Sequence, residues 1–168
     1  MTLSTDAVVH ELYTGDDVRD AVVDRWGPEV APGGVVDRTA IARHAFADPE
    51  ERAWLEGLPW PLVGARVLAF REEAGRRDPP PPAAVVETPL LFEAGMDAAY
   101  DATIAVVADE EVRAGRAAAR GHEAVDERAA RQLSQDEKAA RATYVVRNDG
   151  SVEDLQSGLA VILDRLRR

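Results

Sequence analysis

The sequence contains no cysteine and has few histidines and lysines. Among its 168 residues there are three histidines, and Lys138 is the only lysine. The lack of cysteine excludes a disulfide framework, a thiolate zinc site and a cysteine nucleophile, and three histidines leave little material for a histidine-based metal site. The absence of disulfides favours a cytoplasmic setting.

Long hydrophobic runs and an excess of positive charge are also absent. No apolar run approaches the roughly 20 residues that a membrane-spanning helix needs, and the first residues are acidic, whereas a secretory signal is basic and then apolar. The 31 acidic residues outnumber the 20 basic ones, which gives a formal net charge of -11. Because this charge repels phosphate backbones and anionic lipids, we expect neither nucleic-acid binding nor membrane binding.

The first half of the chain has the apolar spacing of short helices. From Asp6 to Trp26, apolar residues recur at helical intervals with a break around Gly15, so two helices are expected. Asp37 and Asp48 each mark a further helix start, since their carboxylates can accept hydrogen bonds from the free amides there. Another helix is expected from about Leu62 to Arg76, before a stiff run of prolines.

The second half has a different pattern. Three short apolar runs are typical of strands buried on both faces, and they cover Ala83–Val86, Thr103–Val107 and Tyr144–Val146. Helical stretches lie between these runs, and a last helix is expected after Ser151. Strands that alternate with helices predict an α/β protein with a parallel sheet and right-handed connections.

Polar side chains and a turn follow the first of these strands. In parallel α/β sheets ligands bind beyond the carboxyl ends of the strands. Glu87 closes the first strand, and a carboxylate there can hold Mg²⁺ directly or through water. The alternative is a solvated acid at a strand end. Pro89, Leu90 and Leu91 follow, and they are expected to form a rigid turn with an apolar wall.

Basic and amide side chains follow the other two strands. Arg116 and Arg120 stand four residues apart, on one face of an expected helix, and two guanidinium groups there suit a transferring phosphoryl group. Taken alone, these residues favour the alternative, an exposed basic helix paired with glutamates such as Glu110. Asn148 lies in a segment that either presents amides to a purine or is an ordinary turn.

The order and spacing of these segments resemble the dephospho-CoA kinase family over nearly the whole chain. The segments are DAVVHELY, VDRTAIARHAFADPEERAWLEGL, VVETPLLFEAGMDAAYD, EEVRAGRAAAR and SQDEKAARATYVVRNDGS. The resemblance implies a P-loop kinase-like core in residues 1–15 and 83–168, a helical lid at about 113–133 and a helical CoA-acceptor region in residues 16–82. It also implies that ATP, with Mg²⁺, phosphorylates the ribose 3′-hydroxyl of dephospho-CoA in the last step of coenzyme A biosynthesis.

The resemblance also implies roles for individual residues. Asp6 is similar to the carboxylate that orients and deprotonates the acceptor hydroxyl, although a helix N-cap is its simpler interpretation. Arg116 is similar to the arginine that neutralises the transferring phosphoryl group, and Arg120 to its neighbour on the phosphates. Asn148 is similar to the residue on the adenine side, and Glu87 to the acid near the metal.

The acceptor side of the expected site comes from two segments. By resemblance, dephospho-CoA contacts the helix that carries His10 and the turn formed by Pro89, Leu90 and Leu91. A histidine on a helix is, however, more often structural than a ligand.

The chain departs from the family pattern in its phosphate-binding motif. It contains no GxxxxGK[ST] sequence, in which backbone amides and a lysine hold the phosphates of ATP. Ser4 replaces an acid, Trp60 stands where the family tends to have histidine, and Arg147 stands where it tends to have aspartate.

The resemblance begins at the family's second strand. We therefore expect the core to lack its first strand and P-loop, with the strands that end at Glu87 and Val107 left unpaired at facing edges or forced together. A late start assignment, a degenerate remnant and a fragment completed by another chain would each explain this. The chain is then either a dephospho-CoA kinase that is inactive as it stands, or a non-catalytic CoA- or dephospho-CoA-binding or regulatory protein.

Overall fold

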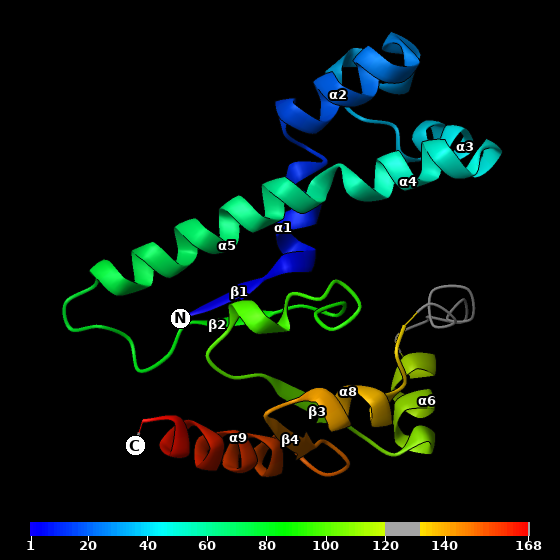
Figure 1. The fold of residues 1–168 in the computed structure, drawn as a ribbon. Helices are drawn as coiled ribbons and strands as arrows, with labels where there is room; N and C mark the ends of the chain where they lie inside the picture. Colours follow the sequence, from blue (N-terminus) through cyan, green and yellow to red (C-terminus); the bar gives the residue numbers. More distant parts are fainter. Residues whose placement is uncertain (120–131, 168) are drawn as a thin grey trace. The chain divides into compact units, whose positions relative to one another are not determined.

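The computed structural model of this protein describes residues 1–119 and 132–167 (Figure 1). The chain divides into two compact units, Met1–Thr88 and Pro89–Arg168. No helix in the described ranges is both long enough and apolar enough to cross a membrane.

The first unit consists of one strand pair and five α-helices. Its elements are β1 (Thr2–Ser4), α1 (Thr5–Leu12), α2 (Asp16–Trp26), two single 3₁₀ turns (Pro28–Val30 and Pro32–Gly34), α3 (Arg38–Ala47), α4 (Pro49–Gly57), α5 (Pro59–Arg76) and β2 (Val85–Glu87). The two helices predicted between Asp6 and Trp26 are confirmed, as is the break between them. In Figure 1, the long helix α5 crosses α1, with which it is in contact.

Two helix starts in this unit depend on the aspartates that the sequence indicates. The Asp37 carboxylate accepts hydrogen bonds from the amides of Thr39, at 2.8 Å, and Ala40, at 3.2 Å. The Asp48 carboxylate accepts one from the amide of Glu50, at 2.7 Å. These bonds satisfy amides that have no partner within the helix, and so they fix where α3 and α4 begin.

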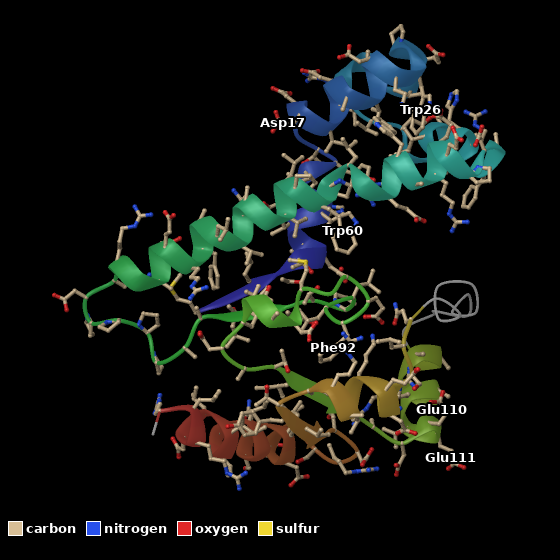
Figure 2. All side chains as sticks on the ribbon, viewed as in Figure 1. Asp17, Trp26, Trp60, Phe92, Glu110 and Glu111 are labelled. Carbon is tan, nitrogen blue, oxygen red and sulfur yellow. The ribbon has the colours of Figure 1, made fainter. Side chains whose placement is uncertain are left out.

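A valine-rich core holds the helices of the first unit together. The buried cluster consists of Val18, Val22, Val30, Ala40 and Ile41. Against it pack aromatic rings from three helices: Trp26 stacks on His44, and it meets Trp54 edge-on, both at 5.1 Å between ring centres. Trp26 packs against this cluster, whereas Asp17, on the same helix, is exposed; both are labelled in Figure 2.

The second unit alternates strands and helices as predicted. It contains a 3₁₀ turn (Asp97–Ala99), β3 (Ile104–Val107), α6 (Glu110–Ala119), α8 (Gln135–Arg141), β4 (Tyr144–Arg147) and α9 (Val152–Leu166). Ser134 and Ser151 each form a capping box with the acid three residues later, so α8 and α9 begin where the sequence indicates.

The strands form two separate two-stranded sheets, both parallel. In one, β1 pairs with β2 so that Ser4 lies opposite Glu87. In the other, β3 pairs with β4 so that Val107 lies opposite Arg147. The parallel arrangement is as predicted, and the strands that end at Glu87 and Val107 each have their partner within their own sheet.

The prediction that these strands are buried on both faces is wrong. Val85, Val106 and Val145 are 48%, 53% and 46% exposed. Each sheet has only two strands, and the helices in contact with them, such as α8 on β3 and α9 on β4, leave these valines partly open to solvent. Helix α9 covers β4, where a Cβ on Gly158 would come within 2.8 Å of the Val146 side chain, so the glycine permits this close approach.

Val22→Ala tests the core of the first unit. The substitution removes two methyl groups from a fully buried site, so we expect the free energy of unfolding to fall by about 2 kcal/mol. Urea denaturation followed by circular dichroism measures it. Val35→Ala is the matched control, because Val35 is 68% exposed and should change stability by less than about 0.5 kcal/mol. Equal losses in the two variants would contradict this core.

Candidate functional site

The β1–β2 sheet brings two candidate carboxylates to one end of the first unit. Glu87 is the last residue of β2 and lies opposite Ser4, and Asp6 follows Ser4 by two residues, in the first turn of α1. Both carboxylates are exposed. Neither has a hydrogen-bond or ion-pair partner within the described residues. The predicted catalytic and metal-binding acids therefore share the carboxyl end of one parallel sheet.

His10 lies one helical turn beyond Asp6, on the same face of α1. Its Nδ1 atom is 3.1 Å from an Arg38 guanidinium nitrogen. Arginine can only donate a hydrogen bond, so Nδ1 is the acceptor in this contact. The His10 side chain is thus held by a contact to α3.

Arg38 is a candidate site residue near His10, and no sequence pattern indicates it. Besides its bond to His10, its guanidinium lies 5.5 Å from the centre of the Tyr13 ring. Burial raises the pKa of the Tyr13 phenol, and the positive charge of Arg38 opposes that change. A cation therefore lies on the His10 side of α1, supplied by a residue 28 positions away along the chain.

The donors at the end of the β1–β2 sheet fit Mg²⁺ in their chemistry. Asp6 and Glu87 supply carboxylate oxygens, and Ser4, opposite Glu87, supplies a hydroxyl. Mg²⁺ is commonly held by one or two carboxylates together with water and substrate phosphates. In the described part of the chain, no group of three or more acidic, histidine or cysteine side chains could hold a metal ion. A metal at Glu87 would therefore need oxygens from a phosphate or from water.

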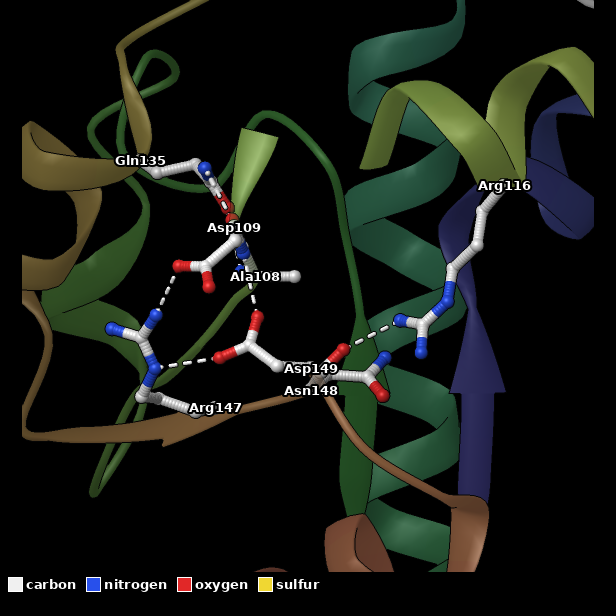
Figure 3. Close-up of polar contacts among 7 residues, drawn as sticks. All are labelled: Ala108, Asp109, Arg116, Gln135, Arg147, Asn148 and Asp149. Atoms are coloured by element: carbon white, nitrogen blue, oxygen red, sulfur yellow. Dashed lines mark hydrogen bonds and ion pairs between the residues drawn. The ribbon is translucent and has the colours of Figure 1, made fainter. Parts of the chain in front are cut away.

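The carboxyl ends of β3 and β4 carry a second cluster, in the second unit (Figure 3). The Asp149 carboxylate accepts hydrogen bonds from the Asp109 amide, at 2.6 Å, and from the Arg147 guanidinium, at 2.7 Å. Arg147 also pairs with the Asp109 carboxylate. The hydrogen bond from the Asp109 amide, followed by the one from Arg147, lowers the pKa of Asp149. This network ties the end of β3 to the loop after β4.

Arg116 and Asn148 are brought together in this unit, although not through the Asn148 side chain. From α6, the Arg116 guanidinium donates to the carbonyl of Asn148 at 2.5 Å (Figure 3). It also donates to the carbonyl of Gly150, at 3.1 Å. It thereby anchors α6 to the loop that follows β4. Arg113, on the same helix, pairs with Glu110 at 2.7 Å, as expected for an exposed basic helix. Arg120 lies outside the described residues, as do residues 121–131 of the predicted lid.

The predicted acceptor turn, Pro89 to Leu91, is the first segment of the second unit. Leu90 is exposed, Leu91 is half-buried and Phe92 is buried. The Pro89 carbonyl accepts a hydrogen bond from Lys138, at 2.9 Å. No local pattern indicates this contact, because the two residues are 49 positions apart.

Comparison with known proteins identifies the family. The dephospho-CoA kinase family profile matches residues 2–154. Dephospho-CoA kinase of Symbiobacterium thermophilum is 38% identical over 156 residues, which are 90% of this chain and 64% of that protein. The enzyme of the same name from Thermus thermophilus is 37% identical over 151 residues, 88% of this chain and 72% of that protein. The chain thus spans about two thirds of the length of these relatives.

Solved structures agree with this match. The crystal structure of TT1252 from Thermus thermophilus superposes with a TM-score of 0.72 and 36% identity, over 98% of this chain and 84% of that one. Dephospho-CoA kinase from Campylobacter jejuni gives a TM-score of 0.68 over 99% and 84% of the two chains, and its 19% identity supports the fold alone. With the parallel strand pairs and the family match over residues 2–154, the chain belongs to the dephospho-CoA kinase family.

Proposed function

We propose that this chain acts in the ATP-dependent phosphorylation of the ribose 3′-hydroxyl of dephospho-CoA, the last step of coenzyme A biosynthesis. The observation that carries the proposal is the pair Asp6 and Glu87, exposed and without a partner in the described residues, at the carboxyl end of one parallel sheet. Family membership over residues 2–154 supports this substrate and reaction.

In the proposed reaction, Asp6 accepts a hydrogen bond from the ribose hydroxyl and takes its proton as the phosphoryl group is transferred. A carboxylate is suited to this, because most catalysis of phosphoryl transfer consists of positioning and charge neutralisation. Glu87 would hold Mg²⁺ together with phosphate oxygens, and such an ion would supply neutralisation of the phosphate charge. His10 lies on the same face of α1 as Asp6, which supports its assignment to the acceptor.

The groups of the second unit have the complementary roles in this proposal. Arg116 contacts the loop that contains Asn148, which supports an assignment of both residues to the nucleotide and its transferring phosphate. Arg120 is proposed as a further phosphate contact. Leu90 and Leu91 offer an apolar surface to the acceptor. They follow Pro89, whose carbonyl is held by a hydrogen bond from Lys138.

One observation favours a second candidate function, the binding of CoA or dephospho-CoA without catalysis. The 168 residues contain no GxxxxGK[ST] motif. The only lysine, Lys138, is bonded to Glu93 and to the Pro89 carbonyl. These residues thus offer no P-loop lysine to the β- and γ-phosphates of ATP, which favours binding without catalysis. We propose that these residues alone bind the acceptor but transfer phosphate at a negligible rate.

Isothermal calorimetry and a coupled ATPase assay on the 168-residue protein test this pair of statements. We expect saturable heat on titration with dephospho-CoA and no ATP turnover above a blank, because an acceptor surface is present and a phosphate cradle is not. Absence of heat would contradict acceptor binding. Turnover that depends on both substrates would contradict inactivity and favour the complete kinase reaction.

Asp6→Asn tests the role of the carboxylate in acceptor binding. We expect dephospho-CoA to bind about tenfold more weakly, because the amide is a poorer acceptor than the charged carboxylate for the ribose hydroxyl. The matched control is Asp17→Asn, which removes an exposed acid from the first turn of α2. The control keeps wild-type affinity, and an equal loss in both variants would assign the effect to net charge.

A further inference from the structure

Helix α8 carries three side chains, each three residues after the last, that reach separate segments of the second unit. These are Gln135, Lys138 and Arg141, which share one face of the helix. The Gln135 amide accepts a hydrogen bond from the Ala108 amide, at 2.9 Å, and donates one to the Ala108 carbonyl, at 3.0 Å. Figure 3 shows the contact between Gln135 and Ala108, directly after β3. Gln135 therefore fixes the start of α8 to the end of that strand.

Lys138, the next side chain along this face, holds the turn that follows Thr88. Its ammonium donates to the Pro89 carbonyl and pairs with the Glu93 carboxylate, both at 2.9 Å. The two side chains are 21% and 15% exposed, the least exposed ion pair in the described part of the chain. Partial burial protects this pair from the solvent screening that weakens surface pairs.

The Glu93 carboxylate is held in one position by two contacts to the same oxygen. The oxygen that pairs with Lys138, Oε1, also accepts a hydrogen bond from the Leu133 amide, at 2.9 Å. The second oxygen, Oε2, is buried and has no hydrogen-bond partner among the residues that the structure describes. Burial raises the pKa of Glu93, but the hydrogen bonds from Lys138, from its own amide and from Leu133 outweigh burial and leave the pKa below its ordinary value. The carboxylate is therefore ionised and anchored at neutral pH.

Arg141 holds the far end of the same turn. Its guanidinium lies over the Phe92 ring, 4.9 Å from the ring centre, and pairs with Asp97 at 3.4 Å. The segment from Pro89 to Asp97 is thus fixed at both ends by cations of α8. Between these contacts lies Leu90, which is exposed.

We propose that Lys138 and Glu93 are positioning residues of the acceptor site, which hold the Pro89–Leu91 turn in the shape that binds the apolar part of dephospho-CoA. This inference rests on the proposed function. If the ammonium is removed, the Pro89 carbonyl is released and Glu93 becomes an unpaired, partly buried carboxylate. The turn then occupies several conformations, and the ligand must order it on binding, which lowers its affinity.

Calorimetry with dephospho-CoA on the full chain tests this role. We expect Lys138→Met to weaken binding at least tenfold. Lys138→Arg recovers affinity to within about threefold, since a guanidinium can still bond to both Glu93 and the Pro89 carbonyl. The control is Arg113→Met, which breaks an exposed ion pair on α6 and leaves affinity within about twofold of wild type. Unchanged affinity in Lys138→Met overturns the proposal.

Amide hydrogen exchange of residues 89–97 tests the positioning role of Lys138 and Glu93 without any ligand. Exchange in this segment should be at least tenfold faster in Lys138→Met and in the milder Glu93→Gln, and near wild type in Lys138→Arg. Unchanged exchange overturns the positioning role, even where calorimetry detects no binding to the wild-type protein. Absence of wild-type binding together with faster exchange would instead overturn the proposed function.

The pH dependence of stability shows which effect dominates at Glu93, its stabilising bonds or the cost of its burial. The pKa of Glu93 is lowered by folding, so ionised Glu93 stabilises the folded state above its ordinary pKa of 4.5, and this contribution is lost as the pH falls through the folded value. We expect the wild type to be more stable to urea than Glu93→Gln at pH 7, with a difference that shrinks below about pH 4.5. A difference of the opposite sign at pH 7 would show that burial dominates.

Discussion

Parallel pairing of very short strands is the constraint on which the rest of this structure depends. It places Ser4 opposite Glu87 in one sheet and Val107 opposite Arg147 in the other. In a parallel pair the carboxyl ends coincide, so whatever follows the two strands meets at one edge. That is why Asp6 joins Glu87 in the first unit, and why Asp109 joins Asp149 in the second.

Sheets of only two strands leave backbone groups at their ends without strand partners, and side chains take over that role. Gln135 bonds to both polar groups of Ala108, and Arg116 bonds to the carbonyls of Asn148 and Gly150. Such bonds matter because an unpaired polar group costs free energy once it is shielded from water. One of these side chains, Arg116, is also a candidate site residue, so at this position the fold and the candidate site use the same side chain.

The features that the sequence predicts correctly are local. Helix starts at Asp37, Asp48 and Ser151 depend on a side chain and amides two or three residues away, and parallel topology follows from the alternation of elements. Strand burial could not be predicted, since it depends on how many strands and helices cover each face. The Arg38–His10 and Lys138–Pro89 contacts join residues 28 and 49 positions apart and have no periodic signature. The chemical roles given to Asp6 and Arg116 depend on family resemblance, and they stay predictions.

Arg147 shows how a departure from the family pattern can be accommodated. Its guanidinium bonds to Asp149 and pairs with Asp109, and the pKa of Arg147 is raised, first by its hydrogen bond to Asp149. With an aspartate at this position, three carboxylates would meet at the ends of β3 and β4, and their mutual repulsion would disfavour this arrangement. The arginine and the two acids are therefore interdependent. In this chain the cation at the end of β4 links both acids, and Arg116 bonds to the carbonyls of the same loop.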